Sequence, residues 1–147
     1  MHRLMSSLRR DERGVSAVEF AFLIPVLATL ILGIVDLSTG LSHRFSLQQA
    51  VNRSLEMVQA NRVPVGATGT QKYDFLETEV KAAVPSATVS LEKWLECNGT
   101  KQGSFEGSCA DGQDTARYLQ LRATRVFRGK MYLKPITLVA TSAVRIQ

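Results

Sequence analysis

The chain has 147 residues and a formal net charge of +5, from 18 Lys and Arg against 13 Asp and Glu. This length suits one small domain with its own core. Beyond Gly14 the 14 basic and 11 acidic residues leave only +3, which is too mild to indicate a nucleic-acid-binding protein. There are two histidines and no hydrolase, metalloprotease or phosphate-loop motif, so we expect no enzyme, no catalytic residue, no metal and no cofactor.

Residues 15–37 form an apolar run in which Phe20 to Val35 carry no charge. As a helix these 23 residues would be about 34 Å long, enough for a bilayer core of about 30 Å. A buried helix of a soluble protein would need a larger chain to surround it. The run is also longer than the h-region of about 7–15 residues in a signal peptide, and no small-residue cleavage site follows it. We therefore predict a transmembrane helix, kinked or loosened at Pro25.

The residues before the run are basic, with four arginines in the first 13 positions. This asymmetry predicts a cytoplasmic N-terminus and a chain that continues outside. The run also contains Glu19, although an ionised carboxylate near hydrocarbon is costly. A cut after Gly14 would free the α-amine of Val15, and Glu19 and Phe20 would become the fifth and sixth residues of the mature chain.

This arrangement of basic leader, Gly and apolar helix with a fifth-position Glu resembles the processing site of type IV prepilin-like proteins. The stretch "ERGVSAVEFAFLIPVL" is most similar to the TadE-like family of tight-adherence (Flp-type) pilus proteins. Val15 and Ser16 depart from the type II secretion pseudopilins, in which Phe usually comes first and Thr often follows. The resemblance implies a minor pilin or pseudopilin of the bacterial inner membrane, with residues 1–14 as the leader and the C-terminal domain in the periplasm.

The resemblance also implies partners and a role in pilus assembly, initiation or adhesion. The partners would be prepilin peptidase, major and minor pilins, an assembly ATPase, inner-membrane platform proteins and membrane lipid. Val15, Glu19 and Phe20 would form a subunit-pairing site, because a carboxylate in a filament core needs a partner such as a neighbour's freed α-amine.

Two alternatives to a cleaved pilin stay open. In the first, Glu19 lies at the membrane interface of an uncleaved bitopic protein, whose periplasmic domain acts as a scaffold for the pilus or secretion machine. In the second, signal peptidase releases a secreted binding domain, which would lack the helix altogether. The mature N-terminus separates these readings.

Beyond Asp36 apolar residues continue at helical spacing, so residues 38–61 are predicted to extend the helix as an amphipathic continuation. The predicted buried face consists of Leu37, Leu41, Phe45, Leu47, Val51, Leu55 and Val58. Residues 62–70 contain one Pro and two Gly and indicate a loop. A shorter helix is predicted at 73–84, where Pro85 ends it.

Three later stretches alternate apolar and polar residues, at 87–97, 117–127 and 136–146. They predict a small three-stranded antiparallel sheet with one face covered by the amphipathic part of the long helix. The expected fold class is therefore α+β and pilin-like, with residues 62–147 as the extracytoplasmic domain. Lys93 and Arg125 fall at inward positions, which indicates that those ends of the covered face are wet.

Cys97 and Cys109 bracket a Gly- and Ser-rich loop, and in an oxidising compartment they are expected to form a disulfide. Two free thiols are the alternative, and a zinc site would need further ligands. Asn98 and Gly99 match both a glycosylation pattern and a tight turn, of which we favour the turn. The "DGQD" at 111–114 lacks the ligand spacing of a calcium loop, which favours a solvated turn.

Basic residues gather around the second predicted strand and the hairpin after it, from Arg117 to Lys134. Such a cluster is able to contact phosphates of DNA or anionic surface polymers. Alternation sends Arg122 and Arg128 to one face of the sheet and Arg125 to the other. We therefore interpret the cluster as part of a solvated sheet face.

Overall fold

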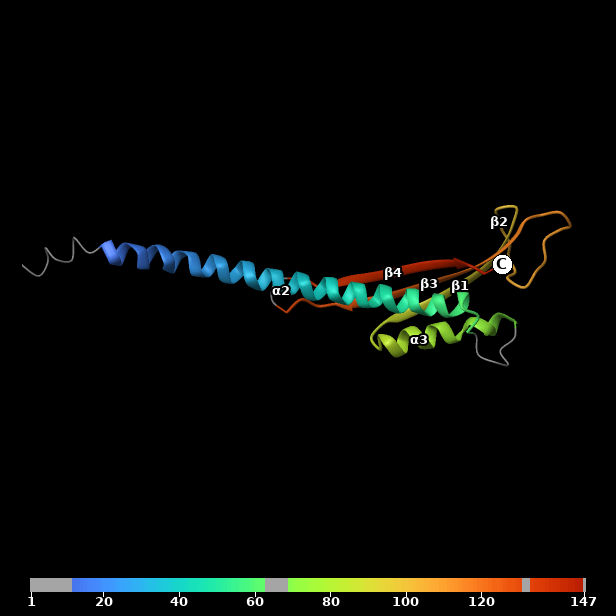
Figure 1. Ribbon diagram of the computed structural model, residues 1–147, viewed down its shortest axis with the longest axis horizontal. Coiled ribbons are helices and arrows are strands. Elements are labelled where there is room, and N and C mark those ends of the chain that lie inside the picture. Colours follow the sequence, from blue (N-terminus) through green and yellow to red (C-terminus); the bar gives the residue numbers. More distant parts are fainter. Residues whose placement is uncertain (1–11, 63–68, 131–132, 147) are drawn as a thin grey trace, which may run out of the picture.

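The computed structural model describes residues 12–62, 69–130 and 133–146 (Figure 1). The predicted leader lies outside these residues except for its last three positions, as does most of the predicted loop at 62–70. The elements in chain order are α2 (Glu12–Gln59), the 3-10 helix η1 (Gly69–Tyr73), α3 (Phe75–Ala83), β1 (Thr88–Cys97), β2 (Thr100–Lys101), β3 (Thr115–Phe127) and β4 (Ile136–Arg145). The α+β class and the long N-terminal helix are as the sequence predicts.

Helix α2 is 48 residues long, and its N-terminal half projects from the folded domain (Figure 1). Pro25 lies inside it, and the helix continues past this residue. In the projecting half the Thr29 hydroxyl donates back to the Val26 carbonyl of the helix at 2.8 Å. This bond satisfies a polar group in a segment that is otherwise apolar. Just beyond Asp36, Thr39 donates in the same way to the Val35 carbonyl at 2.7 Å.

The sheet has four antiparallel strands in the order β2-β1-β3-β4, so the prediction of three strands is wrong by one. The extra strand pairs Thr100 with Cys97 across a two-residue turn. Asn98 and Gly99 have φ angles of 48° and 77°, the left-handed conformations that a tight hairpin turn requires. The favoured turn is therefore confirmed, but a two-residue strand is too short to show alternation in the sequence.

The second half of α2 and helix α3 cover one face of the sheet (Figure 1). Alternate residues of the strands point into this layer, as the alternation predicts, and pack against apolar residues of both helices. The side chains with no exposed surface are Leu47, Val51, Leu76, Val80, Leu119, Leu121 and Ala123. Burial of such side chains, at about 1.5–3 kcal/mol each, is the main stabilising contribution to this domain.

The charged residues at inward positions are partly exposed, in keeping with the expectation of wet ends for the covered face, and both have partners in the helical layer. Lys93 forms an ion pair with Asp74 just before α3, and its side chain is only 15% exposed. The guanidinium of Arg125 lies 3.2 Å from Nδ1 of His43 on α2. Lys93 and Arg125 thus each contact a residue of the helical layer.

The predicted buried face of α2 is right for one half and wrong for the other. Leu47, Val51, Leu55 and Val58 are buried, but Leu37, Leu41 and Phe45 are 57%, 44% and 62% exposed. The predicted face spans an arc of about 160° at 100° per residue, which is wider than the stripe that one sheet covers. The sheet lies against the other edge of this arc, where Asp36, Gly40 and Leu47 are buried.

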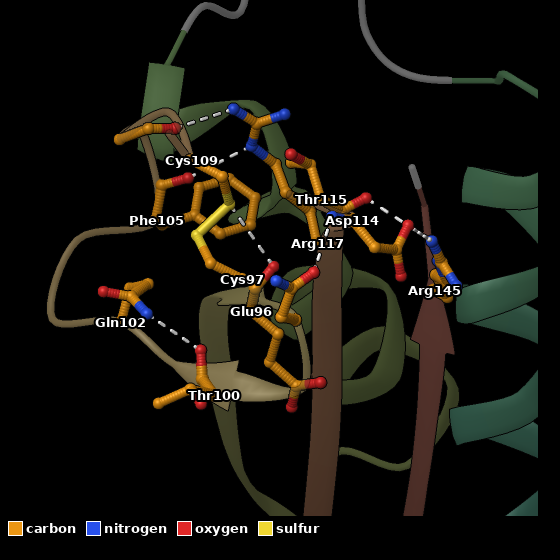
Figure 2. Close-up of a disulfide and its surroundings, with 12 residues drawn as sticks. Glu96, Cys97, Thr100, Gln102, Phe105, Cys109, Asp114, Thr115, Arg117 and Arg145 are labelled. Atoms are coloured by element: carbon orange, nitrogen blue, oxygen red, sulfur yellow. Dashed lines mark hydrogen bonds and ion pairs between the residues drawn. A yellow bond between two sulfur atoms is a disulfide. The ribbon is translucent and has the colours of Figure 1, made fainter. Parts of the chain in front are cut away.

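The segment between β2 and β3 is attached to the sheet at several points (Figure 2). Cys97 and Cys109 form the predicted disulfide, with a Cα–Cα distance of 5.5 Å. The guanidinium of Arg117 donates to the carbonyl of Phe105 at 3.2 Å and to that of Gly107 at 2.9 Å. These contacts give a stretch rich in Gly and Ser a defined conformation.

Asp36 joins the helix to the far end of the sheet. Its side chain is 2% exposed, and its two oxygens accept the backbone N–H groups of Lys130 at 2.9 Å and Leu133 at 3.3 Å. These residues belong to the connection between β3 and β4. One turn further along α2, the ring of Phe127 packs on Gly40, where an added Cβ would lie 3.3 Å from the ring. The β3–β4 end is thus held to α2 at the point where the apolar run stops.

We expect Asp36→Ala to lower the free energy of unfolding of the domain by about 2–4 kcal/mol, because two backbone donors lose a charged acceptor in a buried place. Urea unfolding of the full chain in detergent, followed by the fluorescence of Trp94, measures the change. Asp111→Ala is the control, since Asp111 is exposed and its loss should stay within about 0.5 kcal/mol. Equal stability of the two variants would show that the hydrogen bonds to Asp36 do not contribute to the free energy of unfolding.

Candidate functional site

The surface of α2 is the candidate functional site. In the described ranges no group of three or more His, Cys, Asp or Glu side chains is placed to hold a metal ion. An open, shallow groove on the described surface is lined by residues of α2 alone. The arrangement is thus suited to contacts with other apolar surfaces.

The projecting half of α2 exposes apolar side chains around its whole circumference. Phe20, Phe22, Leu30, Ile31 and Ile34 are each between 58% and 76% exposed. None of the helix's apolar window is buried by the rest of the chain, and the helix is long and apolar enough to cross a membrane. A helix buried in its own soluble domain is therefore not what this chain forms. A continuous apolar surface of this size needs lipid or another protein around it.

The residues of the predicted processing and pairing site lie at the beginning of α2. Gly14 and Val15 are in its first turn, so the bond proposed for cleavage lies within helical backbone. Glu19 follows Val15 by four residues, which places the two on the same face of the helix, and it is exposed. Phe20 is 62% exposed. Glu19 and Phe20 are thus exposed on α2, and the predicted roles of all four residues stay predictions.

Beyond the apolar run, α2 carries an exposed apolar row that sequence reasoning assigned to the core. The row consists of Ile34, Leu37, Leu41 and Phe45. It borders a shallow groove whose remaining lining is polar and mostly small, with Ser38, Ser42, Ser46 and Gln49. At 100° per residue this face lies opposite the buried one. We call these eight residues the outer face of α2.

Asp36 is the structural residue that sequence reasoning missed. The sequence contained one signal for it, because Asp36 is the only acidic residue between Glu19 and Glu56. An isolated carboxylate at the end of an apolar run ordinarily points to water. Here it is buried, because a loop more than 90 positions later in the chain supplies its donors.

Comparison with known proteins gives one match. Residues 14–54 match the family model described as TadE-like protein, whereas no curated protein and no solved structure matches the chain. The matched range begins at Gly14, contains Glu19, Asp36 and the outer face, and ends five residues before α2 does. The match therefore falls on the helix and not on the sheet. Over its N-terminal helix, residues 14–54, the chain is thus similar to the TadE-like family, as the resemblance in its sequence predicts.

Proposed function

We propose that this protein is a minor pilin or pseudopilin of a tight-adherence pilus. The observation that carries the proposal is the coincidence of the TadE-like match with a helix whose apolar surface is left uncovered by its own domain. Such a helix is suited to lipid before assembly and to other helices after it. The protein's action is then assembly rather than catalysis.

In the first step, before assembly, the protein resides in the inner membrane. The basic leader lies in the cytoplasm, α2 crosses the bilayer, and the folded domain lies in the periplasm, in keeping with the arginines before the apolar run. The disulfide between Cys97 and Cys109 fits an oxidising compartment on that side. Prepilin peptidase would then cut after Gly14.

In the second step the new N-terminus meets a carboxylate. Cleavage frees the α-amine of Val15, and a neighbouring subunit presents Glu19 on an exposed helix face. An ion pair in an apolar bundle avoids the several kcal/mol that each unpaired charge would cost there. The pair would fix how far an incoming subunit slides along its neighbour.

In the third step the outer face of α2 packs against helices of other pilins. The row with Leu41 and Phe45 points away from the sheet, so a neighbouring helix is able to reach it without displacing the domain. The serines beside the row are small and permit close approach between helices. Seated in this way, the folded end would initiate, cap or adapt the filament, with the platform proteins and the assembly ATPase of the machine as further partners.

A second candidate is an uncleaved bitopic scaffold of the pilus or secretion machine. The helical backbone around Gly14 and Val15 favours it, since peptidases bind their substrates as extended chain. In that case Glu19 lies at the membrane interface and meets no free amine. Both candidates share the membrane helix and differ in the mature N-terminus.

We expect intact mass spectrometry of the detergent-extracted protein to show a species that begins at Val15 in cells with prepilin peptidase. Cells without the peptidase should contain only the chain with its leader. Gly14→Lys is the matched variant in cells with the peptidase and should also keep the leader. Detection of the full-length chain in both strains would refute the pilin proposal and favour the scaffold.

We expect Glu19→Ala to leave membrane insertion and cleavage unchanged and to lower the number of pili by about tenfold or more, because the freed amine of a neighbour loses its partner. Pilus counts by electron microscopy and the mass of the mature chain are the two measurements. Glu56→Ala is the control, since Glu56 is exposed on the domain half of the same helix. A normal number of pili with Glu19→Ala would refute the proposed pairing of Glu19 with a neighbour's α-amine.

We expect the double variant Leu41→Ser and Phe45→Ser to lower pilus number by about tenfold while the domain keeps its stability, because both side chains are exposed in the isolated subunit and would be buried against a neighbour. Val126→Ser and Val139→Ser form the control, as these residues are 57% and 39% exposed on the sheet. If both double variants assemble normally, the outer face is not the packing surface.

A further inference from the structure

The hairpin formed by β3 and β4 carries positive charge without any acidic residue. From Thr115 to the end of the chain there are seven Lys and Arg and no Asp or Glu. The sequence analysis interpreted six of these seven residues, from Arg117 to Lys134, as part of a solvated sheet face. The structure separates them, and places Arg128, Lys130 and Lys134, all exposed, on the connection between β3 and β4. We call these three residues the basic tip.

The basic tip lies at a fixed position along the axis of α2, next to Asp36. The hydrogen bonds from the Lys130 and Leu133 N–H groups to Asp36 hold the connection beside the first charged residue after the apolar run. Figure 1 shows that the end of β3 and the start of β4 lie on the side of the folded domain from which the first half of α2 projects. Twenty helical residues span a hydrocarbon core of about 30 Å, so a core that begins near Arg13 ends near residue 33. The basic tip therefore lies at the level of the lipid headgroups.

The surroundings of the basic tip suit a membrane surface. Leu133 and Ile136 are 36% and 44% exposed beside Lys134, so cationic and apolar side chains lie together. Asp36 is the nearest carboxylate in sequence along α2, and at 2% exposure it presents no negative charge to the surface. Lys130 engages Asp36 through its backbone, which leaves its ammonium available for another anion.

We propose that Arg128, Lys130 and Lys134 bind the phosphate groups of anionic phospholipids in the leaflet next to the folded domain. Guanidinium and ammonium groups form charge-assisted hydrogen bonds with phosphate oxygens, and juxtamembrane basic residues gain further from the negative surface potential. The domain is then seated on the membrane at two points, by α2 and by the basic tip. This inference goes beyond pilus assembly, since it needs a membrane-spanning α2 but neither cleavage nor other pilins.

The test is lipid retention by the purified full chain, measured by native mass spectrometry after incubation of micelles with phosphatidylglycerol or phosphatidylcholine. The variant Arg128→Gln, Lys130→Gln and Lys134→Gln should retain phosphatidylglycerol about tenfold less than the natural chain and phosphatidylcholine equally. The control is Arg53→Gln, Lys101→Gln and Arg122→Gln, which removes the same charge from exposed positions away from the headgroup level. It should bind both lipids as the natural chain does.

Equal loss in the two triple variants would overturn the proposal, because net charge alone would then explain the binding. Unchanged retention by the tip variant would overturn it as well. Substitution of Lys130 keeps the backbone donor to Asp36, so the domain should stay folded. As a second measurement, hydrogen exchange of the amides of residues 128–130, 133 and 134 should slow in nanodiscs with phosphatidylglycerol relative to phosphatidylcholine alone. No difference between the two lipids would contradict the assigned contact.

Discussion

The carboxylate of Asp36 connects the two halves of this molecule. It is buried at the end of an apolar run, where a charged group without donors would cost several kcal/mol, and two backbone N–H groups from a distant loop satisfy it. The loop, the ends of β3 and β4, and the packing of Phe127 on Gly40 are all placed by this contact. The angle and position at which the folded domain meets the helix follow from it, and so does the division of α2 into an exposed apolar half and a domain half.

Beyond Asp36, the two sides of α2 have different surroundings. One side supplies Leu47, Val51 and their neighbours to the core and gives the sheet its cover. The other side exposes Leu41 and Phe45 in line with the apolar half of the helix. A single helix thereby stabilises its own domain and leaves a continuous apolar surface exposed. The TadE-like match covers both sides of the helix up to residue 54 and stops before the sheet.

Local patterns in the sequence were sufficient for much of this fold. The three long strands, the apolar helix, the Asn98–Gly99 turn and the Cys97–Cys109 disulfide each depend on spacing within a few residues, and each is present. Reasoning failed where a contact joins distant parts of the chain. Periodicity gave the apolar arc of α2 but not which edge of it meets the sheet, and no pattern near Asp36 reveals that residues 130 and 133 return to it. The short strand β2 was missed because two residues show no period.

The strands β3 and β4 run alongside the second half of α2 rather than across it (Figure 1). This alignment has a mechanical consequence. A pull along the helix axis, such as a growing or retracting fibre exerts on its subunits, loads the contacts between helix and sheet in shear. Contacts that are loaded in shear must all break at the same time. In a sheet that crossed the helix, the contacts would break one after another. The alignment of helix and sheet therefore suits this domain to stay folded under lengthwise tension.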